Sequence, residues 1–379
     1  MDFAPTPEHE AFRRVVREFA EAEIAPHSEE WDRTAEFPVD VVRKMGDLGL
    51  FGLPFPEEYG GSGADFATLC IAIEELARVD SSMAITLEAA VGLGANPIHR
   101  FGTEAQKRRW LPDLLAGRAL AAFGLTEPDA GSDAAATRTR AAPDGDEWVL
   151  TGEKAFITNS GTAMTSLISV TALTGADEIS ASIVPADAPG LIVGPSYRKM
   201  GWRASDTHPV RLDECRVPAD ALLGEIGQGL RQFLSILDEG RIAIAAMSVG
   251  VAQGCLDHSL RYAQEREAFG KPIGSNQAIA FGLADMQVAL DAARLLTYRA
   301  AWLRDHGQDH RAAAATAKLF ASEAAVAATR TATQVFGGSG FVDDTVVSRF
   351  YRDAKILEIG EGTSEIQRLL IARDLGLPV

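Results

Sequence analysis

The chain has 379 residues, of which 46% are hydrophobic and 23% charged, and this composition is typical of a folded protein with two or three packed units. Its formal net charge of -17 argues against nucleic acid or an anionic membrane as a partner, because both require basic surfaces. Three scattered cysteines, Cys70, Cys215 and Cys255, lack metal-ligand spacing, so neither a disulfide framework nor a metal site is expected.

The N-terminal sequence predicts a cytoplasmic protein. Residues 1–5 carry no basic segment followed by an apolar run, and no stretch of the chain approaches ~18 uninterrupted apolar residues. The scattered cysteines fit a reducing compartment. We therefore expect an unprocessed cytosolic chain that does not associate with a membrane.

Helical periodicity marks the first third of the chain. Thr6-Pro7 is a typical helix start, and apolar residues then recur at i, i+3, i+4 and i+7 up to Phe19. Further helices are predicted after Pro38 and from Phe66. These patterns predict an α-helical N-terminal domain over residues 1–120.

The pattern changes near residue 120 and changes again near residue 229. Between these points, short runs rich in Val, Ile and Thr alternate with turn signals, which predicts a small antiparallel β-barrel or sheet domain over residues 121–228. Long Ala-rich helical runs then follow, so residues 229–379 should form a C-terminal four-helix-bundle domain. The fold class predicted is therefore a multidomain α+β protein. The expected strands include 148–150, 167–170, 180–184 and 209–212, and the expected long helices are 230–266, 275–306 and 311–336.

Two segments of the β domain have the groups needed to hold a polar planar ligand. The loop 125–133 can present backbone N–H groups and the hydroxyls of Thr126 and Ser132. On the strand that follows, Phe156 and Thr158 should point to one side and offer an aromatic face and a hydroxyl. Both features match an isoalloxazine ring, although each alone is also typical of an ordinary turn and a core aromatic.

Glu361 is the main candidate for a chemical role, because it stands between Gly360 and Gly362. These glycines allow a tight turn and leave the carboxylate accessible to a ligand. Ser364 and Gln367 have the spacing of a capping box, which predicts a helix start behind Glu361. Burial would raise the pKa of Glu361 and the helix end would oppose that rise, so a base able to remove a proton is expected. The alternative is a surface glutamate in a turn.

Residues 350–373 resemble the C-terminal signature of the acyl-CoA dehydrogenase family, in which the Glu of a Glu-Gly-Thr turn removes the α-proton of an acyl-CoA thioester. Five motifs lie in the family order along essentially the whole chain. The resemblance implies FAD as cofactor, Glu361 as the catalytic base, trans-2-enoyl-CoA as product and an electron-transfer flavoprotein as electron acceptor. It also implies a homo-oligomer, usually a homotetramer built as a dimer of dimers. Some members carry the base at the position matching Gly240, where this chain has no side chain.

The resemblance also assigns binding residues in several segments. For the cofactor it implies Phe123, Leu125, Thr126, Gly131, Ser132, Phe156, Ile157, Thr158, Arg266, Phe269, Asn276, Gln277, Gln334, Gly337, Gly338, Thr363 and Glu365. The segment around Arg266 would reach the FAD of a neighbouring subunit, and the Gly-rich turn at 337–338 would approach the same cofactor. For the substrate it implies Ser132, Asp238, Arg241 and Gly362, with Asp238 and Arg241 along the pantetheine of CoA. A surface ion pair on a helix is the alternative for the last two.

Several positions depart from the family pattern and bear on the substrate. Gly360 stands where many members carry Tyr, and Phe156 where the family often has Trp. Ala84 replaces the Arg found in members that act on short dicarboxylates, so an ω-carboxylate substrate is disfavoured. Glu88 could limit the acyl chain length, meet a polar acyl group, or be a helix-surface carboxylate. The same scaffold could also be an oxidase, a nitroalkane-type oxidase or an enoyl-CoA reductase, and a CoA-binding helical scaffold without turnover is the alternative from another class.

Overall fold

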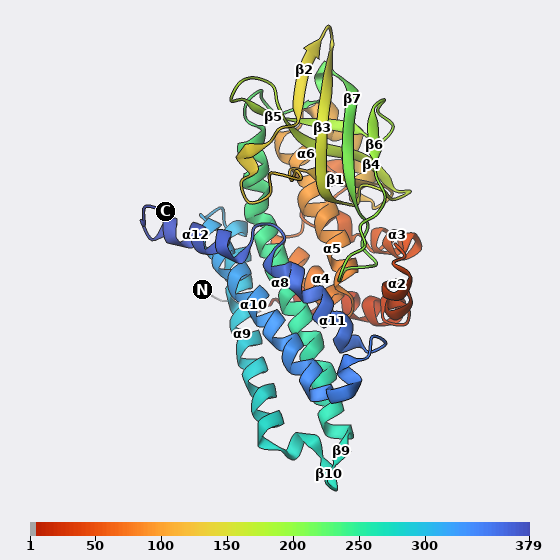
Figure 1. Cartoon of the computed structure of the whole chain (residues 1–379), viewed down its shortest axis with the longest axis vertical. Helices are drawn as coiled ribbons and strands as arrows, with labels where there is room; N and C mark the ends of the chain where they lie inside the picture. The colour runs from red at the N-terminus through yellow and green to blue at the C-terminus, as the bar shows by residue number, and fades with distance from the viewer. Residues whose placement is uncertain (1–4) are drawn as a thin grey trace.

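The computed structural model describes residues 5–379, which form an elongated molecule with a β-sheet at one end and the tip of a helical bundle at the other (Figure 1). Helices of the N-terminal third lie between these two ends, beside the bundle. The predicted fold class is confirmed. Residues 1–4, which entered the cellular-location prediction, lie outside the described residues, and the domain limits at 120 and 228 stay a prediction.

Seven helices make up the N-terminal third of the described chain. They are α1 (Pro7–Phe19), α2 (Ser28–Thr34), α3 (Val39–Asp47), α4 (Phe66–Ala77), α5 (Ser81–Glu88), α6 (Asn96–Phe101) and α7 (Glu104–Leu115). α1 begins as predicted, since the Thr6 hydroxyl accepts a hydrogen bond of 3.2 Å from the His9 N–H. α4 and α5 are buried along nearly their whole length. The Asp305 carboxylate, from the bundle, accepts hydrogen bonds from the first two N–H groups of α4, which ties the two regions together.

The sheet has eight strands in the order β6-β7-β3-β2-β4-β5-β8, with β1 beside β4. Their bounds are β1 (Leu120–Gly124), β2 (Arg140–Asp144), β3 (Glu147–Thr158), β4 (Thr165–Leu173), β5 (Ile179–Pro185), β6 (Leu191–Val193), β7 (Thr207–Pro218) and β8 (Leu222–Leu223). β1 pairs with β4 in parallel, so the sheet is mixed rather than wholly antiparallel as predicted. The β2–β3 hairpin lies between β1 and β4 in sequence, so that β4 can run in the same direction as β1. The sequence patterns of the single strands do not reveal this pairing.

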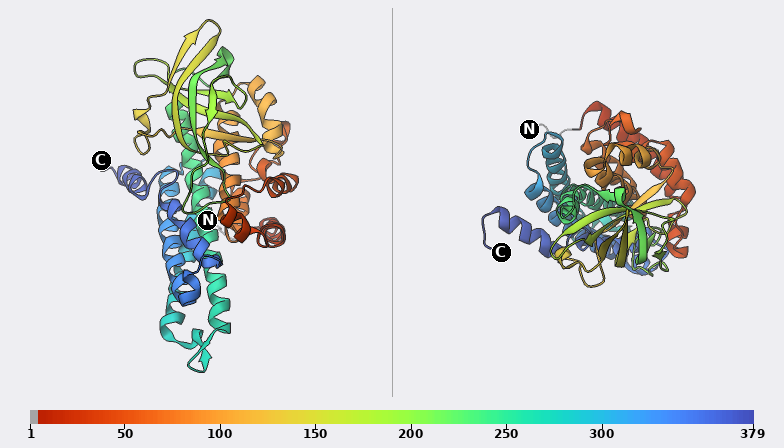
Figure 2. Two further views of the ribbon diagram at one scale, coloured as in Figure 1. Left: turned by 45° about the vertical axis from the view of Figure 1, so that its right-hand side comes forward. Right: turned by 90° about the horizontal axis from the view of Figure 1, so that it is seen from above.

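Three long helices form the bundle: α8 (Gly229–Glu265), α9 (Gln277–Asp305) and α10 (Arg311–Phe336). Each of their ends lies within two residues of the predicted range. A short hairpin of β9 (Glu267–Ala268) and β10 (Lys271–Pro272) joins α8 to α9 at the far tip, and α11 (Val346–Ala354) packs back along the bundle. The last helix, α12 (Ser364–Asp374), projects away from the bundle (Figures 1 and 2). Among residues 5–379, every helix is too short or too polar to cross a membrane.

One continuous hydrophobic core joins the N-terminal helices, β1 and the bundle, while a smaller core lies within the sheet. α8 passes through the middle of the larger core, and most of its residues from 239 to 256 are buried. Side chains on α5, α8 and α10 therefore approach one another inside the protein, and the turn before α12 lies over them.

Candidate active site

Glu361 lies in the tight turn that precedes α12. Its backbone φ is 53°, a left-handed conformation that residues other than glycine rarely adopt, and Gly362 follows with a φ of 95°. The turn directs the carboxylate inward, where both oxygens are buried and accept no hydrogen bond from residues 5–379. Burial raises the pKa of Glu361 to about 7. This is a titratable group in an unusual backbone conformation, a combination typical of functional sites.

The helix behind Glu361 starts differently from the predicted capping box. Thr363 is the cap, because its backbone is extended and its hydroxyl accepts a hydrogen bond from the Ile366 N–H. Ser364 is already the first helical residue, so it cannot serve as the cap. Gln367 instead donates its amide to the Gly362 carbonyl at 2.8 Å. Sequence spacing missed this because Thr363 and Ser364 are both good caps and only the backbone conformation distinguishes them.

Lys318 of α10 is hydrogen-bonded to the same turn. Its side chain is buried, and Nζ donates to the Gly362 carbonyl at 2.7 Å. Burial lowers the pKa of Lys318 to about 8, and its positive charge lowers the pKa of the nearby Glu361. Sequence analysis missed this residue, because a lysine in an Ala-rich helix is usually exposed. The available signal was its place on the apolar stripe, with Ala314 four residues before and Ala321 three residues after it.

Gly240 on α8 makes room for the Glu361 carboxylate. An ideal Cβ built on Gly240 would lie 1.9 Å from Oε2 of Glu361, so no side chain fits there without moving the carboxylate. The next residue, Arg241, is buried and donates Nη1 to Asp238, while its Nε is buried without an acceptor among the described residues. Arg241 also lowers the pKa of Glu361. Arg241 is therefore a buried cation beside the site rather than half of a surface ion pair.

Glu88, the last residue of α5, meets Glu361 from the opposite side. It is 1% exposed, so the interpretation as a helix-surface carboxylate is wrong. All eight residues of α5 are buried, and the helix has no polar face on which a carboxylate could stay in water. Burial raises the pKa of Glu88 well above its usual range, and the neighbouring Glu361 raises it further. The site thus contains two adjacent buried carboxyl groups.

The two predicted ligand segments of the β domain lie side by side. The Ala155 N–H donates to the Thr126 carbonyl at 2.9 Å, and Phe156 next to it is 66% exposed with a φ of 61°. Thr158 is half-buried on the same strand, β3. The side chain of Ile157 points into the sheet core, so only its backbone can face a ligand. The Thr126 loop and the strand with Phe156 are therefore adjacent, and their role in holding a cofactor stays a prediction.

A buried ion pair between Lys154 and Glu127 stabilises the loop that carries Thr126. Lys154 Nζ donates to Glu127 Oε1 at 2.8 Å, and the Arg138 N–H donates to the other carboxylate oxygen at 2.7 Å. Burial acts to raise the pKa of Glu127, but Lys154 and the hydrogen bonds lower it to about 2. Burial lowers the pKa of Lys154 to about 8 despite its partner. The loop that carries Thr126 is therefore held by a charged pair with no access to water.

Other predicted residues near this loop differ in exposure. The Phe123 ring stacks on Phe233 of α8 with centroids 4.1 Å apart, and Leu125 is buried. Gly131 and Ser132 are exposed on the outer part of the loop. Thr363 caps α12, and Glu365 is exposed in the first turn of that helix.

The remaining predicted cofactor residues gather at the far tip of the bundle. Stacking of Tyr262 on Phe336, with centroids 4.2 Å apart, joins the end of α8 to the end of α10 there. Phe269, in the β9–β10 hairpin, is 99% exposed with a φ of 54°. Within one chain, this tip lies at the opposite end of the bundle from the sheet (Figure 1). One chain therefore does not bring all the predicted cofactor residues together. The tip residues are Arg266, Phe269, Asn276, Gln277, Gln334, Gly337 and Gly338.

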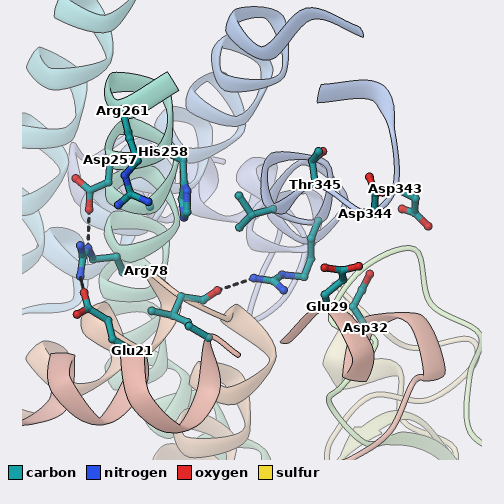
Figure 3. A pocket seen from close by; sticks show the side chains of 15 residues that line it. Glu21, Glu29, Asp32, Arg78, Asp257, His258, Arg261, Asp343, Asp344 and Thr345 are labelled. Carbon is teal, nitrogen blue, oxygen red and sulfur yellow. Dashed lines mark hydrogen bonds and ion pairs between the residues drawn. The ribbon is translucent and has the colours of Figure 1, made fainter. Parts of the chain in front are cut away.

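A separate charged cavity of about 410 Å³ lies between the N-terminal helices, α8 and α11 and does not include Glu361 (Figure 3). Three of its charged side chains pair with one another, and a fourth is held by a backbone carbonyl. Arg78 donates to Asp257 at 2.6 Å and to Glu21 at 2.9 Å, and Arg349 donates to the Val79 carbonyl at 2.7 Å. We therefore place the candidate active site at Glu361 and not in this cavity.

Comparisons with known proteins indicate one protein family along nearly the whole chain. Models of the acyl-CoA dehydrogenase N-terminal, middle and C-terminal domains match residues 6–118, 122–215 and 227–376. A probable acyl-CoA dehydrogenase, YngJ, of Bacillus subtilis is 53% identical over 99% of this chain and 100% of its own length. The mitochondrial short-chain specific acyl-CoA dehydrogenase of Bos taurus is 45% identical over 97% of this chain and 90% of its own length.

Solved structures show the same similarity. Butyryl-CoA dehydrogenase from Megasphaera elsdenii superposes with a TM-score of 0.96 at 40% identity, covering 99% of this chain and 100% of its own. A chain from the structure described as the electron transferring flavoprotein of Acidaminococcus fermentans gives 0.96 at 42% identity, covering 99% of both chains. Glutaryl-CoA dehydrogenase from Mycobacterium smegmatis in complex with FADH2 gives 0.94 at 34% identity, covering 98% of this chain and 95% of its own.

Replacing Lys154 with Met should destabilise the protein, because Glu127 would keep a buried negative charge without its cation. We expect the free energy of unfolding to fall by roughly 3–5 kcal/mol, and the double variant Lys154→Met with Glu127→Gln to recover part of that loss. Denaturant unfolding of the wild type and these two variants measures both effects. Arg138→Met, which breaks an exposed pair with Asp129, is the control and should change stability by less than about 1 kcal/mol. Equal effects of Lys154→Met and the control would contradict this role for the buried pair.

Proposed function

This chain belongs to the acyl-CoA dehydrogenase family of flavin-dependent oxidoreductases, and we propose that it oxidises a short acyl-CoA thioester to the trans-2-enoyl-CoA with Glu361 as the base. The observation that carries this proposal is the buried carboxylate of Glu361, which has no N–H or alcohol donor among residues 5–379 and occupies the space left by Gly240. A buried carboxylate that is not tied to such donors can act on a ligand.

FAD is the cofactor of the family, and the described residues fit it in two places. Phe156 presents an exposed ring beside Thr126 and Thr158, which suits a flavin ring. At the tip, added Cβ atoms on Gly337 and Gly338 would meet nothing within 4 Å, so a phosphate group can approach the backbone. When bound, FAD accepts the hydride that leaves the β-carbon of the substrate.

The groups around Glu361 suit the removal of an α-proton. Lys318 and Arg241 favour the ionised form of Glu361, which would otherwise be costly in a buried site. The Glu361 N–H donates to no acceptor in the described part of the chain and is available to the thioester carbonyl. A hydrogen bond there would stabilise the enolate-like charge that develops as the proton leaves. Gly360 adds no side chain to the turn and leaves room for the thioester.

The residues near Glu361 favour a short acyl group without an ω-carboxylate as the substrate. Ala84 is buried and supplies no cation to pair with a second carboxylate. Glu88 meets Glu361 in the interior and takes up space that a longer chain would need. The similarity to proteins named short-chain and butyryl-CoA dehydrogenases supports this substrate class. The similarity to a chain from the Acidaminococcus structure supports an electron-transfer flavoprotein as the electron acceptor.

Glu361→Gln should abolish reduction of the flavin by substrate while leaving FAD bound. The amide cannot accept the α-proton, so we expect the rate to fall roughly 10³-fold or more. The measurement is anaerobic bleaching of the flavin band by butyryl-, isobutyryl-, octanoyl-, palmitoyl- and glutaryl-CoA. Glu358→Gln, a half-buried residue paired with Lys355 outside the turn, is the control and should keep its rate. Turnover retained in Glu361→Gln would reassign the base, and rapid peroxide formation in air would indicate an oxidase.

Flavin reduction should rise with pH through about 7, because the base must be ionised and burial sets the pKa of Glu361 near this value. Lys318→Met removes a charge that lowers this pKa. The acidic limb of the rate profile should therefore move to higher pH by on the order of one unit. Lys355→Met, which loses an exposed lysine, should leave the limb in place. A limb that does not move in Lys318→Met would contradict the role of Lys318.

We also propose that the protein is a homo-oligomer, with a homotetramer as the expected form. α9 carries exposed apolar side chains every seven residues, Phe281, Val288 and Leu295, at 61%, 69% and 56% exposure. A repeat of seven places them in one stripe along the helix, which is typical of a face that packs against another helix. The separation of the tip from the flavin segments adds support, because a second copy could bring the two together.

Val288→Glu should weaken assembly and FAD retention together, because it places a charge in the apolar stripe. We expect a smaller particle by sedimentation velocity and a loss of several-fold or more in bound flavin per chain. Val15→Glu is the matched control, since Val15 is an exposed valine on α1, away from the stripe. Unchanged sedimentation of Val288→Glu would remove α9 from the proposed interface.

A further inference from the structure

Glu88 and Glu361 are neighbours in the interior, and each lies beside a position that lacks a side chain. A Cβ on Gly240 would lie 1.9 Å from Oε2 of Glu361, and a Cβ on Gly92 would lie 2.7 Å from Oε1 of Glu88. Gly92 belongs to the widened helical turn Ala89–Ala95, which directly follows Glu88. Each carboxyl group thus occupies space left by a glycine in an otherwise close-packed interior. The packing brings these two groups together specifically.

All four carboxyl oxygens of the pair are buried, and within residues 5–379 none accepts a hydrogen bond from a residue outside the pair. Among the described residues no nearby donor reaches the pair, and Nε of Arg241 is itself buried without an acceptor. Lys318 donates to the Gly362 carbonyl, and the Thr86 hydroxyl, two residues before Glu88, donates to the Ser82 carbonyl. Two ionised carboxylates in contact would repel strongly without water or a donor. A single proton between them removes the repulsion and provides the missing hydrogen bond.

We propose that Glu88 and Glu361 share one proton in the substrate-free protein, with Glu88 as the protonated partner that donates a hydrogen bond to the ionised Glu361. Glu88 is then a positioning residue of the active site: it holds the base in its reactive form and aims it over Gly240. This inference rests on the proposed role of Glu361 as the base.

The charges that face the pair decide which member is ionised. Lys318 from α10 and Arg241 from α8 both favour the charged form of Glu361, and the hydrogen bond from Glu88 acts in the same direction. No cation within the described residues favours the charged form of Glu88, whose pKa is raised by burial and by Glu361. The asymmetry places the proton on Glu88 and leaves the charge on the residue in the turn.

The test compares Glu88→Gln with Glu88→Met, two side chains of similar length of which only the first can donate a hydrogen bond. The measurement is the pH dependence of flavin reduction by butyryl-CoA. Glu88→Gln should keep the acidic limb within about half a unit of the wild type, because the amide replaces the donor. Glu88→Met should move the limb to higher pH by on the order of one unit, since Glu361 loses its hydrogen bond.

Two outcomes of this comparison would overturn the proposal. A limb that moves to lower pH in Glu88→Gln would mean that Glu88 is ionised in the wild type and raises the pKa of Glu361 by repulsion. Equal shifts in the two variants would mean that Glu88 acts only through packing.

A second measurement needs no turnover. The infrared difference spectrum between the wild type and Glu88→Gln at pH 7 should contain the C=O band of a protonated carboxyl group in the wild type only. Glu104→Gln is the control and should lack this band, because a hydrogen bond from Tyr59 lowers the pKa of the exposed Glu104. Absence of the band for Glu88 overturns the shared proton even if Glu88→Met does not fold. A band present in a protein that no acyl-CoA reduces would keep the shared proton and reject the proposed function.

Discussion

The hydrogen bonds to the Gly362 carbonyl are the constraint on which the rest of the site depends. Glu361 adopts a left-handed backbone that costs about 1–3 kcal/mol for a residue with a side chain. Lys318 and Gln367 both donate to the carbonyl that follows it, and one of these donors carries a charge. Charge-assisted hydrogen bonds are strong enough to offset strain of this size. The turn therefore keeps its conformation because residues of α10 and α12 both donate hydrogen bonds to it. This conformation fixes the direction of the carboxylate.

Missing side chains shape the pocket around that carboxylate. The core of the protein is continuous from the N-terminal helices through the bundle, and such interiors leave few voids. Gly92 and Gly240 remove side chains at the points where Glu88 and Glu361 project, while Gly360 leaves the turn itself open. Polar side chains fit between α5, α8 and α10 because the residues beside them are small. A side chain at position 240 would displace the Glu361 carboxylate, so the carboxylate keeps its place only because residue 240 is glycine.

The fold followed from the sequence wherever a pattern was long and local. The periodicity of α8, α9 and α10 extends over many turns, so their ends were predicted within two residues. The parallel pairing of β1 with β4 was not predicted, because register between distant strands depends on how the intervening hairpin packs. In the site, Glu361 and the segments around Thr126 and Phe156 could be found from motifs. The burial of Glu88 could not, because a charged residue on a helix reveals its burial only through the helices that cover it, and Lys318 was missed although its place on an apolar stripe was a signal.

The tip of the bundle has a conformation that is hard to account for in an isolated chain. Phe269 is almost fully exposed and has a positive φ. It therefore gains no stability from burial and adopts a backbone conformation that is unfavourable for an aromatic residue. Its neighbours are polar residues and glycines that would suit a phosphate-bearing ligand, yet β3, the strand that carries Phe156, lies at the opposite end of the molecule (Figure 1). If both regions bind one cofactor, they must come from different copies of the chain. Cofactor binding and assembly would then stabilise each other, because each supplies contacts that the other requires.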